Sequence, residues 1–122
     1  MDKTGPVPGA PSLTLADRPL VGDVLMVEEV KVVSDGWVVV HPAAPGGRPD
    51  VDRVLGRAFV QHGTTERVPV DLDGAVAPGT TLVAMLHDDT GEIGRFEFGG
   101  AGTPDQPLMA GGEPVVQSFV VR

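Results

Sequence analysis

The feature that most restricts the fold of this chain is its series of short valine-rich runs, separated by glycine and proline. Apolar residues recur at every second position, as at 68–72, or in short unbroken runs, as at 80–87, and no segment has helical periodicity. β-Branched side chains suit a pleated sheet, and the 17 glycines and 12 prolines supply turns between strands. We therefore expect an all-β fold.

The spacing of these runs predicts seven main strands and a shorter one at the N-terminal end. Strands at this spacing, with turn signals between them, are typical of an immunoglobulin-like antiparallel β-sandwich, in which Trp37 is the candidate core tryptophan. Residues 1–11, rich in proline, predict an extended N-terminal arm before a β-sandwich domain at 12–122. The predicted strands are 12–15, 23–33, 37–41, 53–61, 67–72, 80–87, 95–98 and 115–121.

Three local patterns refine this prediction. The apolar phase of strand 23–33 shifts at Glu28-Glu29, which predicts a β-bulge. The sequence Ser34-Asp35-Gly36 predicts a tight turn that makes 23–33 and 37–41 a hairpin. Pro69 cannot donate a hydrogen bond to a neighbouring strand, so 67–72 is predicted to be an edge strand, whereas 80–87 is expected to be central.

Composition excludes several classes of function. The net charge of −8 and the pI near 4.6 argue against nucleic acid as a partner. The absence of cysteine removes disulfides, thiolate metal sites and cysteine nucleophiles. No apolar run reaches the length needed to span a membrane, and the first residues have no signal-peptide pattern.

The chain also resembles a known but uncharacterised family of β-sandwich domains. The resemblance rests on Gly36-Trp37-Val38-Val39-Val40-His41, Val54-Leu55-Gly56, the run from Thr81 to Glu92, and Phe96-Glu97-Phe98. It extends from about Ser12 to Val121 and departs from the family pattern at Gly46–Asp52. The family occurs in secreted and cell-surface proteins of archaea and bacteria and brings no established activity. The resemblance implies an extracellular or cell-surface location, with Met1 an added residue or the export route not visible in this chain.

Two groups of residues are candidates for binding a metal. His41 and His87 each end an apolar strand; if these strands are neighbours, the imidazoles can approach each other or share a metal with Asp88 or Asp89. Otherwise each imidazole bonds a backbone carbonyl. Blue copper is excluded because the chain has no thiolate, whereas a copper site of histidine and methionine, with Met85 or Met109, stays open.

The second candidate is the acidic loop after His87, which resembles calcium loops without matching the EF-hand spacing. The resulting set for calcium or another divalent cation is His87, Asp88, Asp89 and Glu92.

No pattern predicts catalysis. Ser12, Ser34 and Ser118 lack the context of a catalytic serine, and no glycine loop opens a helix to hold phosphate. We therefore expect no enzymatic activity and no resident cofactor.

The arm and the exposed edge strand are the remaining candidate contacts, because strand addition uses unpaired backbone groups. The sequence thus predicts a structural or interaction domain of the cell surface, self-associating or binding other surface proteins, and capable of repeating in a filament. The predicted contact residues are Leu13, Leu15, Val68, Pro69 and Val70.

Overall fold

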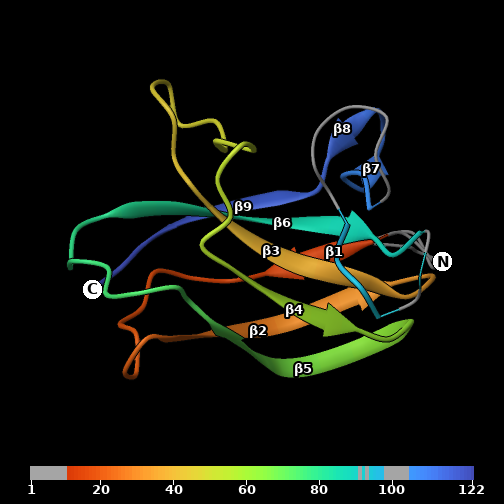
Figure 1. Ribbon diagram of the computed structural model, residues 1–122, viewed down its shortest axis with the longest axis horizontal. Coiled ribbons are helices and arrows are strands. Elements are labelled where there is room, and N and C mark those ends of the chain that lie inside the picture. Colours follow the sequence, from red (N-terminus) through yellow and green to blue (C-terminus); the bar gives the residue numbers. More distant parts are fainter. Residues whose placement is uncertain (1–10, 91, 93, 98–104) are drawn as a thin grey trace, which may run out of the picture.

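The computed structural model describes residues 11–90, 92, 94–97 and 105–122, and they form an antiparallel β-sandwich (Figure 1). One layer is a three-stranded sheet with the order β1-β2-β5, and the other is a four-stranded sheet with the order β4-β3-β6-β9. A two-stranded hairpin, β7-β8, stands outside both sheets. The strands are β1 (Ser12–Thr14), β2 (Val24–Val32), β3 (Gly36–Pro42), β4 (Gly56–Val60), β5 (Gly63–Asp71), β6 (Thr81–Asp88), β7 (Met109–Ala110), β8 (Glu113–Pro114) and β9 (Val116–Val120). The predicted all-β sandwich is confirmed; of the predicted arm, only Pro11 lies within the described residues.

The core lies between the two sheets and is built almost entirely from valine and leucine. Alternate residues of each strand point inward, such as Val38 and Val40 of β3 and Leu82 and Leu86 of β6. Phe119 of β9 is the large aromatic side chain of this core, and it is 2% exposed. Trp37 was expected here, but it lies on the other face of β3, outside this cluster.

The predicted hairpin at Ser34-Asp35-Gly36 is wrong. β2 pairs with β1 and β5, whereas β3 pairs with β4 and β6, so the connection at 33–35 carries the chain from one sheet to the other. A tight turn can join two strands of one sheet or two strands of opposite sheets. Here the two strands lie in opposite sheets, because this places the apolar faces of both in the core between them.

The shift of apolar phase at Glu28-Glu29 is real, but its cause is not a one-strand bulge. The register between β2 and β5 is unchanged on the two sides of the shift: Val27 pairs with Val68 and Glu29 pairs with Glu66. One residue of each strand, Glu28 and Arg67, drops out of the pairing, and Arg67 has a φ of 60°. Both strands therefore change phase together, and their inner residues stay inside.

β5 is an edge strand, as Pro69 predicted. The edge of the other sheet formed by β9 is partly covered by the N-terminal segment. Arg18 pairs in parallel with Val121, and the Asp17 carboxylate accepts a hydrogen bond from the Val120 N–H at 2.8 Å. Residues 12–18 thus join both sheets along one side of the sandwich.

The region between β6 and β9 differs from its prediction. Residues 95–97 are not a strand, and Phe98 lies outside the described residues. The hairpin β7-β8 was not expected; its turn residues Gly111 and Gly112 both have positive φ, which glycine adopts without strain. The described residues contain no helix long and apolar enough to cross a membrane.

Candidate functional site

The outer face of the four-stranded sheet is buried, although it faces away from the core. Trp37, Val39 and His41 of β3 lie on this face beside Val83, Met85 and His87 of β6, and each is at most 7% exposed. The unbroken apolar runs at 37–40 and 82–86 are the sequence signal of this burial, because a strand covered on both faces does not alternate. We call these six residues the outer cluster.

Two segments pack on the outer cluster. Residues 43–55 rise from the sheet away from β1, β2 and β5 (Figure 1), and the Arg53 carbonyl in this segment contacts His41. The second segment follows β6 and includes Phe96. The Phe96 ring packs edge-on against Trp37, with centroids 5.5 Å apart, and Phe59 of β4 packs on Trp37 at 5.4 Å. The Arg57 guanidinium lies over the Phe96 ring, 5.5 Å from its centroid, and makes a cation–π contact.

His41 and His87 meet inside this covered space. Both side chains are 0% exposed, and their ring centroids are 5.7 Å apart. His41 Nδ1 lies 2.7 Å from the carbonyl oxygen of Arg53, and His87 Nδ1 lies 2.7 Å from that of Asp105. The sequence left two alternatives for these histidines, approach to each other or a bond to a backbone carbonyl, and the structure realises both.

Burial determines the charge state of the two imidazoles. The pKa of His87 is lowered to about 4, chiefly by burial; the hydrogen bond to Asp105 opposes the shift, and the nearby His41 adds to it. Burial also lowers the pKa of His41, against the hydrogen bond to Arg53. Both rings are therefore neutral at neutral pH, and because only an N–H can bond a carbonyl, Nδ1 carries the proton in each.

Asp105 organises the cover near His87 and was missed by the sequence analysis. Its carboxylate is fully buried and accepts hydrogen bonds from the backbone N–H groups of Thr90 at 2.8 Å and Glu97 at 2.5 Å. Its own N–H donates to Thr90 Oγ1 at 2.9 Å, and its φ is 63°. Nothing in the local sequence separates this aspartate from a solvated loop residue.

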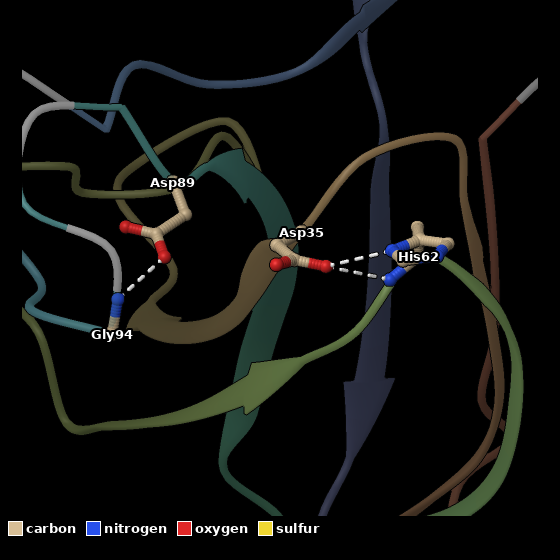
Figure 2. A network of polar contacts seen from close by, with 4 residues as sticks. All are labelled: Asp35, His62, Asp89 and Gly94. Atoms are coloured by element: carbon tan, nitrogen blue, oxygen red, sulfur yellow. Dashed lines mark hydrogen bonds and ion pairs between the residues drawn. The ribbon is translucent and has the colours of Figure 1, made fainter.

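The four predicted cation ligands occupy different surroundings. His87 faces the outer cluster, and Asp88 follows on the opposite face of β6, where burial and then Asp105 raise its pKa. Asp89 is buried, and its Oδ2 accepts a hydrogen bond from the Gly94 N–H at 2.7 Å (Figure 2). Glu92 is exposed and forms an ion pair with Arg95 at 3.7 Å. Among the described residues, no three His, Asp or Glu side chains form a group that could hold a metal ion.

The predicted contact residues lie mostly in the core of this same chain. Leu15, Val68 and Val70 belong to the core cluster, and Leu13 packs against it. They are buried because β1 pairs with β2 and because the inner positions of β5 face the other sheet. Pro69 is the one exposed residue of the five.

The third histidine, His62, has a structural partner. Its backbone N–H and its Nδ1 both lie within hydrogen-bond distance of Asp35 Oδ1, at 2.9 and 3.1 Å (Figure 2). These bonds lower the pKa of Asp35, the backbone bond most. They tie the connection after β2 to the connection after β4.

Comparison with known proteins gives a family match and a similarity to part of a cell-surface protein. A family model described as a domain of unknown function, DUF7282, matches residues 11–122. The chain is similar to cell surface glycoprotein 2 of Haloarcula hispanica, with 25% identity over 107 residues. The match covers 88% of this chain and 11% of that protein, so the chain spans a small part of its relative. No solved structure matches the chain significantly.

Proposed function

Because the chain belongs to the DUF7282 family of domains of unknown function, we propose that it is a non-enzymatic structural or interaction domain of the cell surface. The observation that carries the proposal is the match to a cell surface glycoprotein, which covers nearly the whole chain and a small fraction of the relative. A domain that forms one part of a long surface protein suits a role as a rigid module. The continuous core of buried valine and leucine side chains between the two sheets supports such a role.

The chain contains no asparagine, so it has no acceptor sequence for N-linked glycans. The glycoprotein character in the name of the relative therefore does not extend, in its N-linked form, to these 122 residues. We therefore propose that this domain contributes to the cell surface through its protein surface and not through N-linked glycans.

Location is tested by protease treatment of intact native cells that produce a tagged chain. A surface domain is accessible, so the tag is lost from intact cells while a cytoplasmic control protein survives. Retention of the tag until the cells are lysed contradicts the proposed location.

A finer part of the proposal concerns self-association through an edge strand, with a second copy of the domain as partner. Edge strands are commonly protected by proline, charge or shortness. β5 has Pro69, β4 has the exposed Arg57, and β1 has only three residues. β9, with the sequence Val-Gln-Ser-Phe-Val, has neither proline nor charge. Asp17 and Arg18 occupy its edge at Val120, so the part that can meet a partner is the end that holds Val116, which is 40% exposed. These features favour β9 over the predicted contact at Pro69.

The test is the mass of the full chain measured by light scattering across a concentration series. Ser118→Lys places a charge on exposed β9 and is expected to keep the protein monomeric, whereas the matched change Thr64→Lys on exposed β5 is expected to leave association intact. A chain lacking residues 1–10 retains β1 and isolates the contribution of the arm. A full chain that stays monomeric at every concentration contradicts self-association and leaves the surface location untouched.

A further inference from the structure

The two buried imidazoles approach each other from distant positions on the sheet. His41 pairs with Val83 and His87 pairs with Trp37, so the two histidines are four residues apart along the strands, about 13 Å at the usual strand rise. Their ring centroids are nevertheless only 5.7 Å apart. Both side chains must therefore lean toward each other, across the pair formed by Val39 and Met85. The distal end of each ring, which includes Nε2, consequently faces the other ring.

The hydrogen bonds leave the metal-binding nitrogens in the right state. Each Nδ1–H donates to a carbonyl at 2.7 Å, so each neutral ring has its lone pair on Nε2. Histidines that bind metals characteristically donate their other N–H to a carbonyl or carboxylate in this way, which fixes the ring and raises its basicity. His41 Nε2 is buried and has no hydrogen-bond partner among the described residues. A buried acceptor without a donor is costly, and a bound ion would satisfy it.

The chemistry of the surroundings selects the kind of ion. No group of three His, Asp or Glu side chains occurs among the described residues, so calcium, magnesium and a typical zinc site lack their ligands. The buried thioether of Met85 lies between the histidines on the same face of the sheet. Thioether and imidazole together favour soft copper(I), and neutral ligands in an apolar space favour a univalent over a divalent ion.

We infer that His41 Nε2 and His87 Nε2 bind one copper(I) ion, with the Met85 thioether as third ligand. The ion connects β3 to β6. The two histidines also donate their Nδ1–H groups to the carbonyls of Arg53 and Asp105. By fixing both rings, the ion is therefore expected to stabilise the segments that contain these carbonyls. This site is separate from the proposed surface role, and either can fail without the other.

The test is an anaerobic titration of the full chain with copper(I) in the presence of a chromophoric copper(I) competitor, repeated with silver(I) as a redox-inert probe. We expect one equivalent bound per chain and a rise in Tm of at least about 4 °C at a hundredfold excess over Kd. In the ¹⁵N spectrum of the histidine side chains, the Nε2 signals of His41 and His87 should shift while both Nδ1 atoms remain protonated. Titration with zinc should leave these signals unchanged.

Variants distinguish copper bound at this site from copper bound non-specifically by any histidine. His41→Asn and His87→Asn keep an N–H near the position of Nδ1 while removing Nε2, and should abolish binding; Met85→Leu should weaken it at least tenfold. His62→Gln removes the exposed histidine and should bind like the wild type. Absence of binding by the wild type, equal binding by His41→Asn, or loss of binding in His62→Gln would each overturn the inference. The wild-type NMR result decides the matter even where a variant fails to fold.

Discussion

Single residues hold the connections of this sandwich through carboxylates that accept backbone N–H groups. Asp35, Asp89, Asp105 and Asp17 all act in this way, each on a partner from another part of the chain or the far end of its own loop. A carboxylate bonded to an N–H is a charge-assisted acceptor and is stronger than a neutral one. Part of the acidic composition therefore has a structural purpose within the fold.

Asp35 gives a prediction for pH. Its pKa in the folded protein lies below the ordinary 3.8 because of His62. A lowered carboxyl pKa contributes stability that is present above the unfolded value and is lost as pH falls through the folded value. Carbon-13 NMR titration of the Asp35 carboxyl should give a midpoint below 3.8. His62→Ala should raise this midpoint only in part, because the backbone N–H of residue 62 still bonds the carboxylate. An unchanged midpoint in His62→Ala would show that the side-chain contact does not form in solution.

Gly56 shows how closely two strands can approach at one residue. A Cβ at this position would collide with the carbonyl oxygen of Asp71 and lie 2.9 Å from Cδ2 of Leu72. Gly56→Ala should therefore lower the free energy of unfolding by about 1–3 kcal/mol, as measured in urea. The exposed change Val33→Ala is the control and should shift it by less than about 0.5 kcal/mol. A neutral Gly56→Ala would mean that β4 and β5 can separate without loss.

At the scale of elements, the strands were predictable and their partners were not. The apolar runs placed β2, β3, β6 and β9 to within a few residues, because a strand buried on one face alternates and a strand buried on both faces is an unbroken apolar run. The hairpin at 34–36 was wrong because local turn chemistry does not say which sheet the next strand joins. The strand at 95–98 was wrong because Phe96 reaches the outer cluster from an irregular segment, pairing with no strand.

The two histidines of the candidate site could be predicted from the sequence, but their complete burial could not. Two apolar strands that both end in histidine indicated that the imidazoles can approach each other. Their complete burial depends on the covering segments, whose positions follow from Asp105 and from the carbonyl of Arg53. Such contacts join residues far apart in the chain and leave no periodic signal.

The cover near His87 should depend on Asp105. In Asp105→Asn, the amide nitrogen must face one of two backbone N–H groups, from Thr90 or Glu97, so one buried hydrogen bond is lost. We expect a destabilisation of about 1–3 kcal/mol. Trp37, the only tryptophan, lies beneath Phe96 and reports on the cover through its emission, which should move to longer wavelength. Unchanged emission and stability would contradict a structural role for this carboxylate.

At the scale of the whole molecule, the net charge of −8 opposes the compact state. Like charges on a small domain repel, and salt screens the repulsion between exposed groups. The Tm should therefore rise steadily as sodium chloride is added to a low-salt buffer. Potassium chloride should have the same effect, because screening does not depend on the cation. A rise with one salt alone would point to specific ion binding.

The hairpin β7-β8 has a practical consequence for anyone wishing to attach a label to this domain. The chain leaves the edge of β6 at Leu108, whose N–H bonds the carbonyl of Leu86, and returns at Val115, whose carbonyl bonds the Leu86 N–H. The Val115 N–H also bonds the Leu108 carbonyl, which closes the base of the excursion. A peptide tag or a small folded domain inserted between Gly111 and Gly112 would leave these three hydrogen bonds intact. The turn is thus a natural display point, where new sequence can be added without redesigning the scaffold beneath it.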